Sequence, residues 1–266
     1  MKYALHRIRQ FLREQSGVNL GLDKDYLIES RLHSTLKHHK LADFDALARE
    51  IADEPGGKLA SAVITALTTH ETSWFRDQRP FDRLRSEVLP RLREGEARQL
   101  SVWSAACSSG QEIYSIAMLL REEGFIEPAW QISLLASDIC ESALARAQRG
   151  IYSPFEVARG LPDHYLARYF RKNEEHWEIT PLLRERISFA LINLIRLPAQ
   201  LVPFDIIFCR NVLIYFDTAT QGAVLQGLHD RLRPGGVLFL GAAESPLGLC
   251  EGLQPCAGTS GLYYRV

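Results

Sequence analysis

The stretch that decides the fold spans residues 100–112 and reads LSVWSAACSSGQE. Its first part, Leu100 to Ala105, is a short, mostly apolar run of the length of a buried strand. Small residues and a single glycine, Gly110, follow it, and a helical pattern begins at Gln111. A strand that turns tightly into a helix is typical of the ligand-binding edge of an open α/β sheet, where backbone N–H groups meet the ligand.

Other apolar runs supply the rest of this sheet. The runs with the length of buried strands cover residues 132–137, 187–191, 205–209 and 237–240, and 262–266 resembles a closing strand. Helical patterns over residues 111–123, 141–148 and 218–232 separate most of them. This alternation predicts an α/β fold with a doubly wound, Rossmann-like and largely parallel sheet over residues 100–266.

The remaining regions have different patterns. Residues 1–67 repeat apolar positions at helical spacing and predict a small all-α N-terminal domain, with a linker and connector helix over residues 68–99. Phe81, Leu84, Val88 and Leu89 form the apolar stripe of the connector, and Pro90 predicts a break in it. Two predicted short strands, 165–170 and 177–179, interrupt the α/β alternation, so we expect a small antiparallel β insertion at about 160–186.

Composition restricts the class of protein. The 31 Lys and Arg nearly balance the 32 Asp and Glu, so no overall field favours nucleic acid or a membrane surface. The five cysteines lack a C-x-x-C pair, which gives no reason to expect a metal. We find no apolar run long enough to span a bilayer and no signal-peptide pattern, and therefore expect a cytoplasmic protein without membrane insertion.

The loop after the first strand restricts the ligand. It lacks the G-x-G-x-x-G spacing of dinucleotide sites, so a pyrophosphate ligand is disfavoured. By itself it fits a compact turn as well as a binding site. Asp138, which ends the second strand, can accept hydrogen bonds from both ribose hydroxyls, although it could equally cap the next helix. Glu112 can offset a cationic ligand or simply favour its helix N-terminus. Together with the loop, the two acids favour an adenosyl ligand.

Four sequence blocks, taken in order, resemble the CheR family of chemoreceptor glutamate methyltransferases. They are TTHETSWFR at 68–76, WSAACSSG at 103–110, ASD at 136–138 and FCRNVLIYF at 208–216, and the likeness continues to GAAES at 241–245. The resemblance implies methyl transfer from S-adenosylmethionine to glutamates on the cytoplasmic helical bundle of chemoreceptors. The products would be glutamyl methyl esters and S-adenosylhomocysteine.

The resemblance also implies a set of cofactor contacts. By motif position, these are His70, Thr72, Arg76, Glu112, Asp138, Asn193, Leu194, Arg210 and Asn211. Asn193 follows the third strand and could bond an adenine edge. His70 departs from the family pattern, because many relatives have asparagine there. A neutral imidazole can still donate or accept one hydrogen bond.

Arg76 and Tyr215 are the residues we expect to align the substrate. A glutamate carboxylate is already ionised near neutral pH, so its methylation needs positioning and no general base. Arginine offers a donor fork that matches a carboxylate, and a tyrosine hydroxyl can donate one hydrogen bond. The plainer interpretations are a surface ion pair of Arg76 with Asp77 or Glu71 and an ordinary aromatic in the apolar segment that contains Tyr215.

Substrate recognition is predicted at the N-terminal domain. Residues 24–40 are locally basic, and with Ile28, Leu32 and Leu36 facing inward we expect Arg31, His33 and Lys37 to project outward. Arg31 and Lys37 are therefore the predicted receptor contacts, with an ordinary solvated helix face as the alternative.

The same resemblance bears on the partner. Some family members bind a tethering pentapeptide at the receptor C-terminus through the edge of the β insertion. The turn between the two strands predicted here is short and lacks glycine, so we expect this chain to work without the tether. We also expect a monomer. The competing functions are a methyltransferase for a small molecule or another protein, and a regulatory module that binds the cofactor without turnover.

Overall fold

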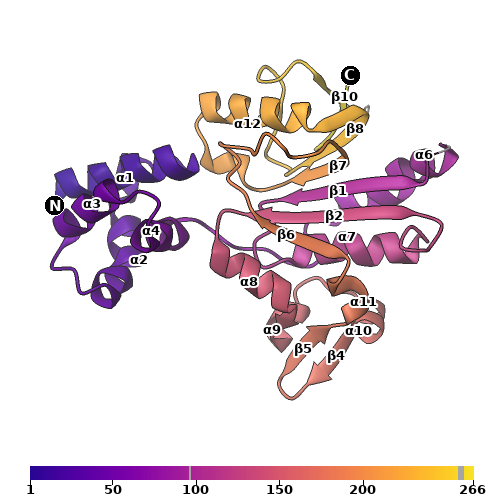
Figure 1. Ribbon diagram of the computed structural model, residues 1–266, viewed down its shortest axis with the longest axis horizontal. Coiled ribbons are helices and arrows are strands. Elements are labelled where there is room, and N and C mark those ends of the chain that lie inside the picture. The colour runs from indigo at the N-terminus through magenta and orange to yellow at the C-terminus, as the bar shows by residue number, and fades with distance from the viewer. Residues whose placement is uncertain (96, 257–260) are drawn as a thin grey trace.

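The computed structural model describes residues 1–95, 97–256 and 261–266; residue 96 of the predicted linker and residues 257–260 of the predicted sheet region lie outside the described residues. The chain forms an all-α N-terminal bundle, a seven-stranded sheet with helices on both faces, and a small antiparallel sheet (Figure 1). The predicted fold class is therefore confirmed. Among the described residues, no helix combines the length and apolar character needed to cross a membrane.

Four helices build the N-terminal bundle: α1 (Lys2–Ser16), α2 (Asp25–His38), α3 (Phe44–Asp53) and α4 (Lys58–Leu67). Their inward faces carry the apolar residues that the helical spacing predicts, including Ile8, Leu12, Ile28, Leu32, Leu47, Ile51 and Val63, all at most 1% exposed. Gly17 ends α1 in a left-handed conformation, and the Asp43 carboxylate caps α3 by accepting a hydrogen bond from the Ala46 N–H.

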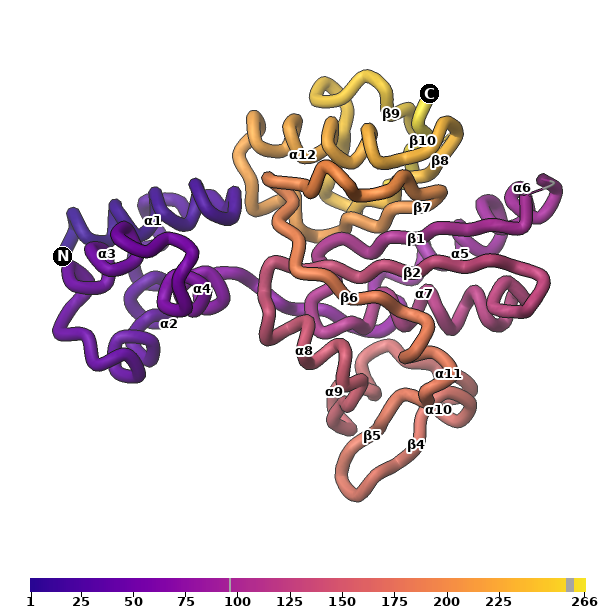
Figure 2. The backbone as a smooth tube through the Cα atoms, in the orientation of Figure 1, coloured from indigo at the N-terminus to yellow at the C-terminus, as the bar shows by residue number. Residues whose placement is uncertain are grey.

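The chain then crosses to the sheet through an extended linker, which Figure 2 traces from α4 onward. The connector consists of α5 (Arg79–Arg83), a π-helical turn (Leu84–Val88) and α6 (Leu89–Glu94). The predicted apolar stripe is buried, but the predicted break at Pro90 is wrong. Pro90 is the second residue of α6 and directly follows the π-helical turn, so the helical path continues through it.

The central sheet has the strand order β6-β2-β1-β7-β8-β10-β9. The strands from β6 to β8 run parallel, and β10 is antiparallel to both of its neighbours. The bounds are β1 (Gln99–Ala105), β2 (Gln131–Asp138), β6 (Ile187–Leu191), β7 (Phe204–Cys209), β8 (Leu232–Leu240), β9 (Leu253–Pro255) and β10 (Leu262–Arg265). All predicted strands of this sheet are present, whereas β9 and the first half of β8 were not predicted.

Helices cover both faces of the sheet. Alternate residues of β1 face opposite sides, so Val102 packs with α7 (Gln111–Glu122) and the connector, and Trp103 packs on the side of α12 (Thr218–Asp230). The side of α12 is continuous with the core of the N-terminal bundle. Another helix, α8 (Glu141–Arg149), follows β2. Burial on both faces explains why the strands read as continuous apolar runs.

The antiparallel insertion differs from its prediction. Its strand order is β3-β5-β4, with β3 (Ile151–Tyr152) lying before the expected start at residue 160. β4 (Phe170–Asn173) and β5 (His176–Ile179) form a hairpin. The predicted strand over 165–170 is wrong, because residues Asp163–Tyr169 form the helix α10. Tyr165 and Tyr169 are buried while Ala167 between them is exposed. A strand would place all three on one face, whereas a helix places only the two tyrosines together. Two short helices, α9 (Pro154–Val157) and α11 (Pro181–Arg184), complete this region.

Gly110 is required for packing. It has φ of 94°, and a Cβ added there would lie 2.8 Å from the Ala147 Cβ on α8. Gly110→Ala should therefore lower the free energy of unfolding by about 2–4 kcal/mol, from backbone strain and overpacking together. Urea denaturation measures this change.

Gly124→Ala is the matched control. Gly124 also has positive φ, but a Cβ there meets nothing within 4 Å. It should lose only the strain, about 1–2 kcal/mol. Equal losses at the two glycines would contradict the packing role of Gly110.

Candidate functional site

A pocket opens at the carboxyl ends of β1, β2 and β7, between the sheet, the linker and the N-terminal bundle. Every site residue predicted from the sequence lines it except Lys37. The lining includes Arg31, His70, Thr72, Arg76, Glu112, Asp138, Asn193, Leu194, Arg210, Asn211 and Tyr215. These residues come from chain segments far apart in sequence. Those after β1, β2, β6 and β7 meet because parallel strands end at the same edge, and the linker and α2 bring the others to it.

Asp138 holds the loop after β1. One carboxylate oxygen accepts the Ser108 N–H at 2.8 Å, and the other accepts the Cys140 N–H at 2.9 Å. Asp138 therefore binds both the backbone of the loop after β1 and the backbone directly before α8. Each oxygen can accept a further hydrogen bond, so Asp138 can also serve a ligand in the pocket. Ala106 and Ser108 approach the pocket with left-handed backbones, whereas the glycine of the loop faces α8.

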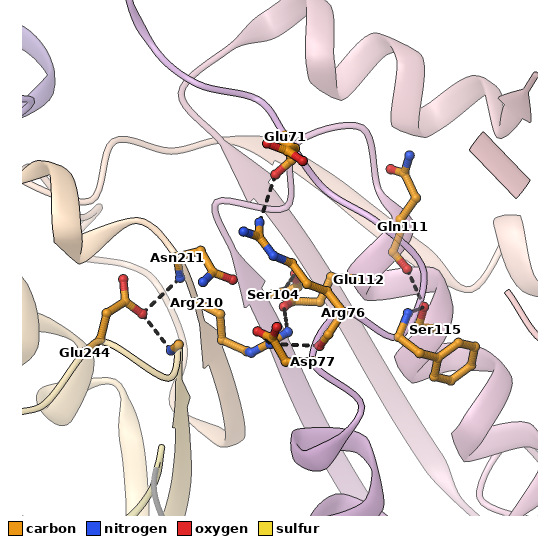
Figure 3. Close-up of polar contacts among 12 residues, drawn as sticks. Glu71, Arg76, Asp77, Ser104, Gln111, Glu112, Ser115, Arg210, Asn211 and Glu244 are labelled. Atoms are coloured by element: carbon orange, nitrogen blue, oxygen red, sulfur yellow. Dashed lines mark hydrogen bonds and ion pairs between the residues drawn. The ribbon is translucent and has the colours of Figure 1, made fainter. Parts of the chain in front are cut away.

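The buried Arg210 guanidinium is the centre of a hydrogen-bonded network at the pocket (Figure 3). Its side chain is 1% exposed and donates to the Glu112 carboxylate at 3.0 Å and to the Asp77 carboxylate at 2.7 Å. It also donates to the Arg76 carbonyl oxygen at 2.8 Å. Glu112 accepts a further hydrogen bond from the Ser104 hydroxyl. Arg210 thus ties the linker to β1 and α7.

The linker around Arg76 has a constrained backbone. Phe75, Asp77 and Gln78 all have positive φ, which is unfavourable for residues with a side chain. Buried Ser115 on α7 accepts the Phe75 N–H at 3.1 Å, and the carbonyl of Arg159 accepts the Trp74 N–H. These contacts hold the linker in a conformation that it would not adopt alone.

The Arg76 guanidinium points into this region and donates to the Glu71 carbonyl oxygen at 3.1 Å (Figure 3). The alternative interpretation, an ion pair of Arg76 with Asp77 or Glu71, does not hold: Glu71 pairs with Arg159 and Asp77 pairs with Arg210. Within the described residues, Arg76 has no carboxylate partner. It is half-buried and can therefore receive a carboxylate from a substrate.

The N-terminal bundle closes one side of the pocket. The pocket lining here includes Ser16, Val18, Asn19 and Leu20, which the sequence did not single out. Val18 forms a β-bridge with Phe216. The Asn193 side-chain amide donates to the Gln15 carbonyl oxygen at 2.7 Å and so links the two parts of the chain. Asn193 lies in the pocket, but part of its hydrogen-bonding capacity is used within the protein.

The two predicted receptor contacts lie in different places. The expected outward projection of Arg31 is wrong, because its guanidinium donates to the carbonyls of Leu67 and Thr68 at the end of α4. These carbonyls lack helical partners, which makes them good acceptors for a cation. Arg31 lines the pocket instead, while Lys37 is exposed on α2 and outside it.

His70 packs against a polar cluster beside Asp138. Its Nε2 lies 2.8 Å from the Thr68 hydroxyl, and its carbonyl accepts the Ser108 hydroxyl. The interaction with the Cys140 thiol raises the His70 pKa although burial opposes this. Burial would raise the Cys140 pKa, but hydrogen bonds from His70, Ser142 and Thr65 outweigh it and lower that pKa to about 6. His70 is thus coupled to Cys140 at the edge of the pocket.

Comparison with known proteins identifies the family. Residues 70–260 match the model of the CheR methyltransferase SAM-binding domain, and residues 4–68 match the CheR all-α domain. The chain belongs to the CheR methyltransferase family. It is 39% identical to the chemotaxis protein methyltransferase Cher2 of Pseudomonas putida, over 97% of this chain and 96% of the relative. Chemotaxis protein methyltransferase 1 of Pseudomonas aeruginosa is 40% identical over 97% and 95% of the two chains.

The pocket suits the cofactor of this family. S-adenosylmethionine presents ribose hydroxyls and a positively charged sulfonium, and Asp138 and Glu112 are carboxylates on the sheet side of the pocket. Carboxylates accept hydroxyl hydrogen bonds and offset positive charge. These acceptor groups therefore fit S-adenosylmethionine. The predicted family, cofactor and enzyme class are confirmed.

Asp138→Asn tests the cofactor side of the pocket. An amide cannot accept the two N–H bonds of Ser108 and Cys140 with both of its ends. We expect the affinity for S-adenosylmethionine, measured by calorimetry, to fall by about 10- to 100-fold. Asp163→Asn, at an exposed position on α10, is the control and should bind normally. Unchanged binding by Asp138→Asn would remove Asp138 from the site.

Proposed function

We propose that this chain methylates glutamate side chains on the cytoplasmic helical bundle of chemoreceptors. Its family establishes S-adenosylmethionine-dependent methylation in chemotaxis. The single observation that supports a carboxylate acceptor is Arg76, a pocket arginine with no carboxylate partner among the described residues. We further propose that the chain acts in the cytoplasm as a monomer.

The chemistry requires alignment of two groups. S-adenosylmethionine supplies a methyl group on a sulfonium, and transfer breaks the carbon–sulfur bond as the methyl carbon bonds to a carboxylate oxygen. Because the glutamate is already ionised, no residue has to remove a proton. Arg76 would hold the carboxylate through its donor fork, and the Tyr215 hydroxyl would donate a further hydrogen bond to orient it.

The cofactor contacts are proposed with different weights. We propose as direct contacts the pocket residues Thr72, Glu112, Asp138, Leu194 and Asn211. His70 and Asn193 also line the pocket and are proposed as contacts through hydrogen-bonding capacity that the protein itself does not use. Arg210 uses its two terminal nitrogens within the protein. We therefore propose that Arg210 acts mainly by fixing Glu112 and the backbone of Arg76.

The receptor-binding surface is proposed on the bundle side of the pocket. Arg31 lies at the pocket, and exposed Lys37 lies further along α2. Their positive charges would attract the acidic, glutamate-bearing helices of a receptor. We propose Lys37 as a contact for approach and Arg31 as a contact nearer the methylated residue.

Radiolabelled methyl transfer from S-adenosylmethionine to receptor cytoplasmic fragments tests the function. We expect labelled fragments whose label is released by mild base, as an ester requires. A chain that binds the cofactor but labels no fragment would support the regulatory alternative. Base-stable label would indicate a different acceptor group.

Arg76→Ala is the decisive variant in the same assay. Loss of a charge-assisted pair to the substrate carboxylate should lower kcat/KM by about 100-fold. Arg79→Ala, at an exposed position on α5, should retain activity, and circular dichroism should report a normal fold for both variants. Near-normal methylation by Arg76→Ala would refute its role.

The β insertion bears on the tether. β4 and β5 pair from Phe170–Ile179 to Asn173–His176, which leaves a two-residue turn of Glu174 and Glu175. We propose that this enzyme works without a receptor pentapeptide. Calorimetry with such peptides should detect no binding, while receptor fragments that lack the C-terminal peptide are methylated at the normal rate. Tight peptide binding would overturn this proposal.

A further inference from the structure

Glu244 is a buried acid that the proposed chemistry does not use. It lies just after β8, in the turn closed by the hydrogen bond from its N–H to the Gly241 carbonyl, and is 6% exposed. Figure 3 shows its carboxylate directed at the segment that follows β7, beside Asn211. Within the described residues, no cation lies within ion-pair distance of it.

Four backbone N–H groups surround this carboxylate instead. One oxygen accepts the N–H of Gly241 at 2.6 Å and that of Asn211 at 2.9 Å. The other accepts the N–H of Val212 and that of Leu213, both at 2.8 Å. Three of the four donors are consecutive residues, and Asn211 has φ of 59°. Successive N–H groups that converge in this way form an anion-binding nest, and here the protein supplies the anion.

The approach of the two segments leaves no spare room. A Cβ added to Gly241 would lie 2.7 Å from the Glu244 carboxylate and 2.9 Å from the Asn211 backbone nitrogen. Glycine at 241 is therefore needed for the end of β8 to lie against the segment after β7. The carboxylate and this contact together fix the backbone of residues 211–213.

The fixed backbone leads directly into the pocket. Residues 213–215 form a single 3-10 turn, η3, with the Tyr215 N–H donating to the Val212 carbonyl. The Asn19 N–H donates to the Tyr215 carbonyl at 2.8 Å from the other side. The backbone of Tyr215 is thus held from two sides: through residues 211–213, which Glu244 binds, and by the N-terminal bundle through Asn19.

We propose that Glu244 is a positioning residue for methyl transfer, which fixes the backbone that carries Tyr215. The inference rests on the proposed function, because it acts through the substrate-aligning role of Tyr215. Small displacements of an aligning group strongly reduce the rate of a displacement reaction. Of the proposed direct cofactor contacts, Asn211 lies on the segment that Glu244 fixes, while the others come from the linker, α7, β2 and the segment after β6. A shift of this segment should therefore lower turnover more than it lowers cofactor affinity.

Glu244→Gln tests this proposal in the full chain. The amide has nearly the same shape, but its NH₂ end would face two backbone N–H groups and force the segment to move. We expect kcat to fall by about 100-fold, while the calorimetric affinity for S-adenosylmethionine, to which Asn211 is one of several proposed contributors, falls by less than about tenfold. Glu251→Gln, at an exposed position in the same stretch, is the matched control and should keep full activity.

A double-mutant cycle with Tyr215→Phe separates positioning from general stability. If Glu244 acts through Tyr215, the double variant should lose no more activity than the worse single variant. Independent, multiplying losses would overturn the proposal. If Glu244→Gln does not fold, Gly241→Ala tests the same role, because the added Cβ would lie too close to the Glu244 carboxylate. This variant should have a lower kcat and should still bind the cofactor.

The outcomes also separate this inference from the proposed function. Absence of receptor methylation by the wild-type chain would defeat the function itself. An active wild type together with normal kcat for Glu244→Gln or Gly241→Ala would defeat only the role of Glu244.

Discussion

The buried Arg210 guanidinium is the interaction on which the rest of the site depends. It joins Glu112 on α7 and both the Asp77 carboxylate and the Arg76 carbonyl on the linker. Removing one partner of a buried ion pair costs about 3–5 kcal/mol, because the other charge is left uncompensated. The linker has three positive-φ residues around Arg76 and needs such an external restraint. The position of Arg76 is therefore set by the sheet, although Arg76 itself lies outside it.

Two buried carboxylates, Asp138 and Glu244, fix loops at the edge of the sheet. Asp138 accepts two backbone N–H groups from the segments after β1 and β2, and Glu244 accepts four from the segments after β7 and β8. Loops at the carboxyl ends of strands contain N–H groups that no ladder satisfies. Buried acids satisfy several at once and leave the loops rigid. The same chemistry that binds an anionic ligand in other α/β folds is used here for internal order.

The sequence predicts the fold where its signal is local. Strands buried on both faces read as apolar runs, so the parallel core was predicted, whereas the short β3 and β9 contain too few residues to form a pattern. The spacing of Tyr165 and Tyr169 fits either a helix or a strand, and only the burial of the folded chain distinguishes the two. The pocket residues were predicted because motif blocks end the strands. Glu244 was not, because bonds between one side chain and backbone about thirty residues away leave no local signal. The inward direction of Arg31 was missed for a similar reason, because the α4 carbonyl that accepts its hydrogen bond lies 36 residues away in the sequence.

Charge pairing in the pocket fits a reaction in which charges disappear. Arg210 is neutralised by Glu112 and Asp77, and Arg159 by Glu71, whereas Arg76, like Arg31, has no carboxylate partner among the described residues. In the proposed function, a substrate glutamate would pair with Arg76 before transfer. Once methylated, the ester carries no charge and accepts a weaker hydrogen bond from the guanidinium. The interaction that holds the substrate is therefore weakened by the reaction itself, which favours release of the product. Because the neighbouring cations are already paired and fixed, Arg76 would bind the substrate glutamate more strongly than the methyl ester product.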